Sequence, residues 1–304
     1  MSEFPHPDQP AAPAGPPAVR IVCVVYNPGP ELRSFAKTLA QATYRPYELV
    51  VVDNGDPTDV VRELAAAGAT VLRHPGGNVG YGTAANLGAA DSAAPWVVVA
   101  NPDVEWEPGS LDLLIEAGDA DPLAGSLGPR ILNTDGTTYP SARALPSLSV
   151  GIGHALLHTV WPGNPWSREY RQAEATVGAT EPRPVGWLSG ACLVLRPDAF
   201  AQVGGFDERY FMFFEDVDLG DRLGKAGWRN VYVPGAQVTH VQGVSWKHSP
   251  APMIRAHHAS AKQYLFDRWG AWWQAPVRLA IGVGLWVRER VEVTLAGWER
   301  RRSH

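Results

Sequence analysis

The sequence predicts an α/β fold with a mixed, mostly parallel central sheet flanked by helices, and a helical extension at the C-terminus. Four continuous apolar runs alternate with segments of helical periodicity before residue 104. Polar residues follow the ends of three of these runs. From about Pro250 the chain has a helical pattern that is rich in Trp and Arg. Strands that alternate with helices are typical of right-handed crossovers, which build parallel sheets.

The first half contains the elements on which this prediction depends. Pro30 lies near the first turn of one expected helix, and a second helix has Asp56 as its expected cap and Gly68 after its end. The Gly-rich stretch 76–90 is expected to enter a third helix. The expected buried strands are "VRIVCVV" (19–25), "YELVVVD" (47–53), "ATVLRH" (69–74) and "APWVVVA" (94–100).

The second half has shorter strands and more turns. Residues 127–143 are expected to form a hairpin that turns at Asp135 and Gly136. The run 186–200 is expected to be a strand that leads into a helix, and 203–228 should contain a helix rich in carboxylates. This half completes the sheet.

Composition limits the classes of function. A chain of 304 residues, 45% of them hydrophobic, can bury one large core with a smaller unit appended. The net charge of -5 gives no electrostatic footprint for nucleic acid, so no nucleic-acid partner is expected. Cys23 and Cys192 lie in predicted strands, where reduced core thiols are expected rather than a disulfide, as suits the cytoplasm.

We divide the chain into three parts. Residues 1–18 are rich in Pro and Ala, and we expect a disordered tail without the features of an export signal. Residues 19–249 are expected to form the main domain, and residues 250–304 a helical extension. The longest apolar stretch is too short to span a bilayer.

Polar residues gather where the predicted strands end. Ligands on parallel sheets bind at the carboxyl ends of the strands, so these residues are site candidates. Each of them alone is also an ordinary turn former. The candidates are Tyr26, Asn27, Asp53, Asn54, Asn101 and Asp103.

The stretch 210–214, "YFMFF", places five apolar residues directly before Glu215 and Asp216. Desolvation by aromatic rings disfavours a charged carboxylate and raises its pKa, which suits a general base. Asp218 and Asp221 follow at helical spacing, and for these two we expect a solvated helix face.

Seven motifs follow one another along the chain: "VVYN", "VVDNG", "NVGYGTAANLG", "VANPDV", "WLSGACLVLRP", "GGFDERYFMFFEDVDLGDRLGKAGW" and "TH". In this order they resemble the inverting, nucleotide-sugar-dependent glycosyltransferases of family 2, which have the GT-A fold. The resemblance covers about residues 19–245 and implies a nucleotide-binding half, 19–105, and an acceptor half, 106–249.

Within that family, "NPDV", "YPSARALPS", "WPGNPW" and "PVGWLSGACLV" resemble the actinobacterial rhamnosyltransferases of arabinogalactan linker synthesis. This narrower resemblance implies dTDP-rhamnose as the donor and N-acetylglucosaminyl-diphospho-polyprenol as the acceptor. Transfer of another sugar from UDP or dTDP to a different glycan is the alternative.

The resemblance also implies roles for the donor-side residues. Tyr26 would stack on a pyrimidine base and Asp53 would accept its imide N–H, which separates uracil or thymine from cytosine. Asn78 and Gly80 would line the pocket where the chain passes close to the ligand. The remaining donor-binding candidates are Asn27, Asn54 and Asn101.

A divalent cation, Mg2+ or Mn2+, is implied as the group that neutralises the leaving diphosphate. Family members carry an Asp-x-Asp motif at the end of the fourth strand, but here Asn101 replaces the first carboxylate. Asp103 is therefore the expected ligand, with His240 as its partner. A hydrogen-bonded core histidine is the alternative interpretation of His240.

Asp216 is implied as the general base that deprotonates the acceptor hydroxyl, with Glu215 orienting the acceptor or the loop. Trp187, Ser189 and Gly190 are expected to line the junction between donor and acceptor, although Trp187 is equally compatible with a core position. Arg143 is expected to meet the acceptor diphosphate, the alternative being a surface arginine.

The C-terminal extension has the composition of an interfacial element on anionic lipid. We therefore expect a cytoplasmic protein that is peripheral on the inner face of the membrane; a helical pair packed on the domain, or on a second copy in a homodimer, is the alternative. The residues concerned are Trp269, Trp272, Trp273, Trp286 and Trp298, with Arg255, Arg268, Arg278, Arg288, Arg290 and Arg300 to Arg302.

Two other classes of function fit the sequence less well. A nucleotidyltransferase would need a basic residue in a Gly-rich loop after the first strand, which "YNPGPEL" lacks. A non-catalytic sugar-binding scaffold is disfavoured because Asp103, Asp216 and His240 are all present.

Overall fold

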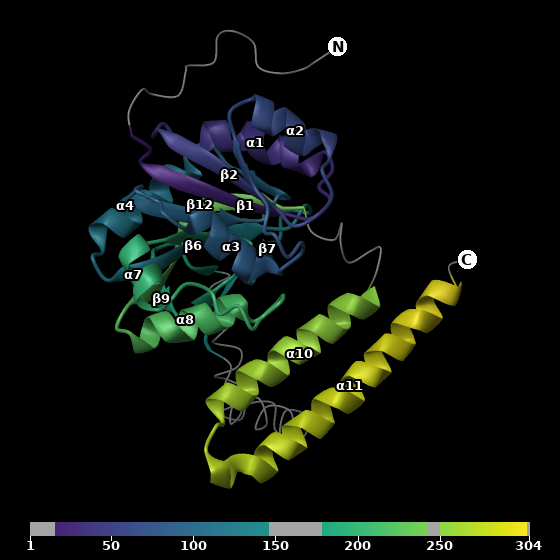
Figure 1. Ribbon diagram of the computed structural model, residues 1–304. Coiled ribbons are helices and arrows are strands. Elements are labelled where there is room, and N and C mark those ends of the chain that lie inside the picture. The colour runs from purple at the N-terminus through teal and green to yellow at the C-terminus, as the bar shows by residue number, and fades with distance from the viewer. Residues whose placement is uncertain (1–15, 146–177, 242–249, 303–304) are drawn as a thin grey trace.

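A mixed sheet forms the centre of the molecule (Figure 1). The computed structural model describes residues 16–145, 178–241 and 250–302. The first fifteen residues of the predicted tail and the "WPGNPW" motif lie outside this range. In the sheet the strand order is β3-β2-β1-β4-β11-β6-β12-β5, with β7 beside β6 and β9 beside β12.

The four strands of the first half are parallel, as predicted. Their bounds are β1 Val19–Val25, β2 Tyr47–Asp53, β3 Thr70–Leu72 and β4 Trp96–Ala100. One expectation was wrong: β3 is a short edge strand with partly exposed side chains, because among the described strands it pairs with β2 alone. Its apolar run is too short to cover both faces of a sheet.

The second half adds antiparallel strands, so the sheet is mixed. Its strands are β5 Val104–Trp106, β6 Ala124–Leu132, β7 Thr138–Tyr139, β9 Arg183–Val185, β11 Cys192–Leu195 and β12 Arg229–His240; β8 Ala142–Arg143 and β10 Trp187–Leu188 form a separate pair. The hairpin through Asp135 and Gly136 joins β6 to β7, as expected. The run expected as one strand after 186 is divided into β10 and β11, because residues 189–191 bend away from both.

Helices cover both faces of the sheet. They are α1 Glu31–Ala42, α2 Asp59–Ala66, α3 Tyr81–Ala89, α4 Ser110–Ala120, α7 Pro197–Gln202 and α8 Glu215–Lys225. Thr58, and not Asp56, caps α2: its hydroxyl accepts the Val61 N–H at 3.4 Å.

Alternate residues of β1 enter two hydrophobic cores, which explains why the strand is apolar from Ile21 to Val25. Ile21 packs with α1 and α4, whereas Val22 packs with α3 and α7 on the other face. Cys23 and Cys192 are buried free thiols, as expected.

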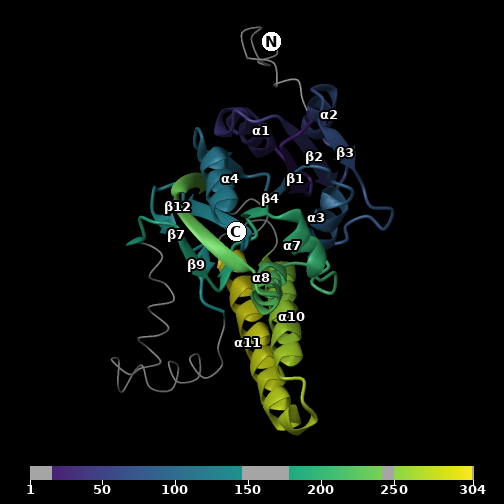
Figure 2. The ribbon, with the colours of Figure 1, turned by 90° about the vertical axis from the view of Figure 1, so that its left-hand side faces the viewer.

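The C-terminal extension is an antiparallel helical hairpin that leaves the domain beside α8 (Figures 1 and 2). Helix α10, Pro250–Arg268, is joined to α11, Ala275–Arg302, through a turn that includes the 3-10 helix Trp272–Gln274. In both views this turn lies at the opposite end of the molecule from α1 and α2. None of the described helices combines the length and apolar character needed to cross a membrane.

Candidate functional site

Asp103 and His240 meet at the end of the sheet, as the sequence predicted. Strand β12 pairs with β5 so that His240 lies opposite Val104, next to Asp103. A register shift between Val233 and Gln237 redirects the last part of β12. Nε2 of His240 then lies 3.0 Å from Oδ1 of Asp103.

Asn101 completes this group. Its amide nitrogen lies 3.3 Å from the same Nε2, and a flip of the amide brings the oxygen to that point. Nδ1 of His240 is buried and has no partner in the part of the chain that the structure describes. Across residues 16–145, 178–241 and 250–302, no group of three or more His, Cys, Asp or Glu side chains could hold a metal. The available ligands are therefore one carboxylate, one imidazole and one amide. These three suffice for a divalent cation that also binds phosphate oxygens of its substrate.

Asp216 is the second residue of α8 and faces the loop before β11. Its Oδ2 accepts the main-chain N–H of Gly190 at 2.8 Å, and its Oδ1 accepts that of Val217 at 2.8 Å. The next residue, Ala191, accepts the Asn101 N–H at 3.0 Å. The segment Gly190–Ala191 therefore connects Asp216 to the group formed by Asp103, His240 and Asn101.

Tyr81 is a site residue that the sequence analysis missed. The Tyr81 hydroxyl donates to the Gly190 carbonyl at 2.6 Å, and a Cβ on Gly190 would lie 3.4 Å from the Cβ of Asp216. "NVGYG" marked this tyrosine only as part of a loop. The Tyr81 hydroxyl therefore supports the main chain at Gly190.

Burial raises the pKa values of both acidic residues at the start of α8. For Glu215, desolvation and the neighbouring Asp216 charge raise the pKa to about 8, and one carboxyl oxygen is buried without a partner among the residues that the structure describes. Desolvation also raises the pKa of Asp216, opposed by the Gly190 and Val217 N–H groups and by Arg143. Glu215 is thus the residue that keeps its proton at neutral pH, whereas the two N–H groups that bind Asp216 favour the charged form of its carboxylate.

An unusual backbone precedes these two residues. Phe213 and Phe214 both have positive φ angles, 67° and 64°, which are costly for bulky side chains, about 1–3 kcal/mol each. This conformation turns the chain sharply into α8, so that Glu215 is buried inside the domain and Asp216 reaches Gly190. The aromatic run was recognised in the sequence, but its backbone conformation was not.

On the donor side, Asp53 is buried and its two oxygens are already bound. One accepts the Gly55 N–H at 2.9 Å and the other is ion-paired with Arg73. Arg73 was missed because a single arginine after a strand gives no local signal. The role of Asp53 toward a base stays a prediction, and Arg73 joins it as a candidate.

The other donor-side residues mainly shape loops. Asn27 accepts the Asp56 N–H at 2.8 Å, and Asn54 donates to the Gly80 carbonyl at 3.0 Å. Asn78 accepts the Gly80 N–H at 3.1 Å. Gly80 has a φ of 86°, and a side chain there would collide with the Phe211 carbonyl, which ties the donor loop to the aromatic run. Tyr26 is 59% exposed, as a stacking platform must be.

The acceptor-side candidates are brought together by the small sheet. Strands β8 and β10 pair Arg143 with Trp187, and the guanidinium lies 5.8 Å from the indole centroid. Ser189 donates its main-chain N–H to the Ser141 carbonyl at 2.7 Å. Trp187 is only partly buried, and the Arg143 charge opposes the rise of the Asp216 pKa, so both residues lie on the side of the site that holds Asp216.

The expectation of a solvated face for Asp218 and Asp221 was wrong. Asp221 is buried and pairs with Lys225 at 2.8 Å, and Asp218 pairs with Arg222 at 2.7 Å. The C-terminal hairpin covers this side of α8. The composition of α8 alone could not show that the C-terminal hairpin covers this side of the helix.

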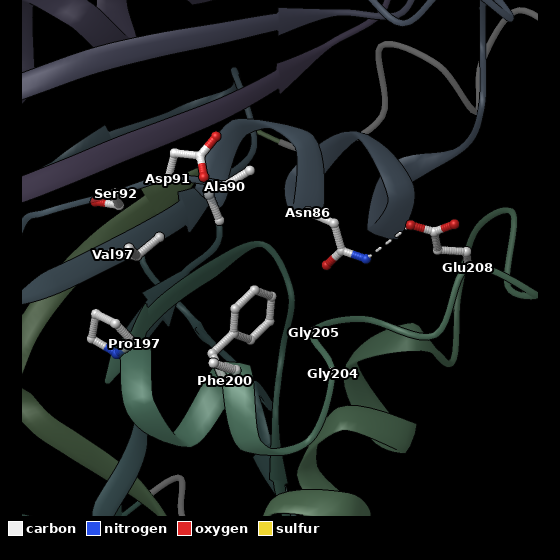
Figure 3. A pocket seen from close by; sticks show the side chains of 12 residues that line it. Asn86, Ala90, Asp91, Ser92, Val97, Pro197, Phe200, Gly204, Gly205 and Glu208 are labelled. Atoms are coloured by element: carbon white, nitrogen blue, oxygen red, sulfur yellow. Dashed lines mark hydrogen bonds between the residues drawn. The ribbon is translucent and has the colours of Figure 1, made fainter.

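A hollow of about 460 Å³ lies elsewhere, between the C-terminal end of α3 and α7 (Figure 3). Asn86 and Glu208 line it and share a 3.4 Å hydrogen bond, with Phe200 and Asp91 on its walls. None of the predicted site residues lines this hollow. It belongs to the packing of α3 against α7.

The family described as Glycosyl transferase family 2 matches residues 20–202. Among curated proteins, the chain is 49% identical over 291 residues to the N-acetylglucosaminyl-diphospho-decaprenol L-rhamnosyltransferase of Mycobacterium tuberculosis. That match covers 90% of this chain and 92% of the relative. A pre-mycofactocin glycosyltransferase of the same organism is 31% identical over 238 residues, 77% of this chain and 45% of the relative.

Solved structures share the fold at low sequence identity. A mannosyltransferase from Pyrobaculum calidifontis, in complex with GDP-Man and Mn2+, matches with a TM-score of 0.52 and 16% identity, covering 96% of this chain and 87% of that one. GalNAc-T7 with UDP, GalNAc and Mn2+ matches with a TM-score of 0.56 and 16% identity, covering 80% of this chain and 48% of that one. The predicted GT-A fold is thereby confirmed.

Proposed function

The chain belongs to glycosyl transferase family 2 and is a glycosyltransferase, and we propose that it transfers L-rhamnose from dTDP-rhamnose to N-acetylglucosaminyl-diphospho-polyprenol. The observation that carries this proposal is the 49% identity to a decaprenol-linked rhamnosyltransferase over nearly the whole of both chains. In cells this reaction would serve the linker of the arabinogalactan. The alternative is transfer from another UDP- or dTDP-sugar to a different glycan.

Asp216 acts as the general base in this proposal. Its carboxylate is held by the N–H groups of Gly190 and Val217, while burial keeps it more basic than an exposed aspartate. It accepts the proton from the acceptor hydroxyl as that oxygen attacks the anomeric carbon. Attack from the face opposite the nucleotide inverts the anomeric centre without a covalent enzyme intermediate.

Glu215 supports the base from inside the domain. A protonated Glu215 adds no second negative charge beside Asp216, and two adjacent carboxylates cannot both ionise cheaply in a buried site. Because its side chain is buried, it acts on the loop and on the charge of Asp216, and the acceptor contacts fall to Trp187, Ser189 and Arg143.

The donor binds across the carboxyl ends of β1, β2 and β4. Tyr26 stacks on the base, and Asp53 and Arg73 recognise the polar edge of the base. The loop at Asn78 and Gly80 passes close to the sugar nucleotide. Asp103, His240 and the Asn101 amide oxygen would hold a divalent cation, Mg2+ or Mn2+, which when bound stabilises the charge of the leaving diphosphate.

The C-terminal hairpin brings this site to a lipid-linked acceptor. The aromatic side chains at its turn are strongly exposed, Trp272 by 86% and Trp273 by 64%, and Trp286 follows on α11 at 57%. Arg278 and Arg290 lie on the same element, a combination that favours the interface of an anionic membrane. Peripheral binding at the inner face of the membrane follows from this proposal. The side chains of Trp298 and Arg300 to Arg302 lie outside the described residues.

A transfer assay tests the proposed function. The protein is incubated with dTDP-rhamnose, Mn2+ or Mg2+ and a short-chain N-acetylglucosaminyl-diphospho-polyprenol, and the product is analysed by mass spectrometry and NMR. We expect addition of one deoxyhexose with inverted anomeric configuration. Thermal-shift screening against other UDP- and dTDP-sugars decides the donor. Transfer of a different sugar, with dTDP-rhamnose left intact, would contradict the rhamnosyl assignment.

A further inference from the structure

The hairpin helix α10 is bound directly to the aromatic run that precedes the proposed base. The Ser260 hydroxyl donates a hydrogen bond to the Met212 carbonyl at 2.7 Å. The His257 ring lies edge-on to Phe213 and Phe214, with centroid distances of 5.6 and 5.5 Å. Ser260 is only 5% exposed, so this contact is part of a packed interface.

Further contacts join α10 to residues on either side of the aromatic run. Arg209, just before the aromatic run, pairs with Asp267 at 2.7 Å. Arg268, at the end of α10, lies 3.4 Å from Asp221 of α8. Tyr264 is 3% exposed and packs on Phe214 with a centroid distance of 5.7 Å. Helix α10 therefore contacts both the aromatic run and helix α8, which carries Glu215 and Asp216.

The backbone that α10 contacts has an unfavourable conformation, which other contacts must stabilise. Phe213 and Phe214 hold positive φ angles, and such backbone persists in bulky residues only where the surroundings stabilise it. The Phe214 carbonyl accepts the Asp218 N–H at 2.9 Å and begins α8. Any relaxation at 213–214 would therefore rotate the first turn of α8 and move Asp216 away from Gly190.

We propose that α10 is a positioning element of the catalytic site: through Ser260 and His257 it holds Met212–Phe214 in the conformation that directs Asp216 toward the acceptor. The inference rests on the proposed role of Asp216 as the base. It assigns the hairpin a second task beside membrane binding, because the contacts lie at the α8 side of α10 and not at its exposed turn.

Ser260→Ala tests the proposal, since it removes the donor to Met212 without adding an atom. His257→Leu is a second variant that removes the ring contacts at similar volume. For both we expect kcat to fall about tenfold while the KM for dTDP-rhamnose changes less than about twofold, as for a base displaced by a fraction of an ångström. Amide hydrogen exchange in the peptide covering 210–217 should accelerate.

Thr43→Val is the matched control. It removes a buried hydroxyl that donates to Asp112 at 2.6 Å, on the other side of the domain, so it costs stability without touching the aromatic run. We expect a lower Tm with unchanged kcat. The proposal is overturned if both α10 variants keep wild-type kcat and exchange, or raise only KM. A wild-type protein inactive with dTDP-rhamnose would count against the proposed function, while the exchange data would still decide the role of α10.

Discussion

The main-chain N–H of Gly190 donates a 2.8 Å hydrogen bond to Oδ2 of Asp216. Gly190 precedes β11, and its neighbour Ala191 binds Asn101, which lies beside His240. A single bend between two strands thus positions the proposed base relative to the proposed cation ligands. It also explains why the run after residue 186 is not one continuous strand.

Asp216→Asn should lower kcat by about three orders of magnitude, because an amide keeps the size of the side chain but cannot accept the acceptor's proton. Binding of dTDP-rhamnose and Mn2+ should persist, as measured by calorimetry. Asp218→Asn is the matched control, since this aspartate pairs with Arg222 on the same helix. Turnover of the Asp216 variant within tenfold of wild type would remove the base assignment.

Asp103→Ala should weaken donor binding only when the cation is present. The Asp103 carboxylate and the His240 imidazole are 3.0 Å apart, so loss of either leaves one strong protein ligand. We expect the Kd for dTDP-rhamnose to rise at least about tenfold in Mn2+ and to match wild type in EDTA. Asp135→Ala, at the exposed β6–β7 turn, serves as the control. Equal weakening with and without Mn2+ would argue against cation binding at this pair.

Several parts of the molecule could be predicted because their signals are local. The strands β1, β2 and β4 contain the continuous apolar runs 21–25, 49–52 and 96–100. The meeting of Asp103 with His240 has no local signal, and it was expected only because of the family resemblance. The hairpin through Gly136 is a turn signal with the positive φ that glycine favours.

The features that could not be predicted depend on contacts with residues far away in the chain. Asp221 is buried because Arg268 of α10 covers it, and the helix pattern around Asp221 contains no trace of that contact. The backbone of Phe213 and Phe214 likewise depends on α10. Arg73 becomes visible as a candidate only through its pairing with Asp53.

Glu215 should make the protein less stable as the pH rises. Its pKa is raised from an ordinary value of 4.5 to about 8 in the folded state, so between these values the unfolded chain releases a proton that the folded chain keeps. The stability contributed below pH 4.5 is therefore lost progressively toward pH 8. Each pKa unit corresponds to about 1.4 kcal/mol, so chemical denaturation can measure the effect.

Glu215→Gln should flatten this pH dependence, because the amide stays neutral at every pH in the range. Urea unfolding at pH 5 and at pH 8 measures this pH dependence. From pH 5 to pH 8 the wild type should lose more than about 1 kcal/mol of unfolding free energy, and the variant should lose clearly less. Glu116→Gln, on the exposed side of α4, should retain the wild-type slope. Identical slopes for all three proteins would show that Glu215 ionises normally.

Trp272→Ser combined with Trp273→Ser should reduce binding to anionic vesicles at least about tenfold, since two exposed indoles at the hairpin turn supply most of its apolar contact with lipid. Flotation with vesicles of phosphatidylglycerol and phosphatidylcholine measures the bound fraction, and turnover of a short-chain, water-soluble acceptor should stay unchanged. Tyr44→Ser removes an aromatic ring that is 71% exposed beyond the end of α1, so it controls for loss of any surface ring. Equal flotation of the wild type and the double variant would refute membrane binding through this turn, and a dimer detected by light scattering would then identify a second copy as the occupant.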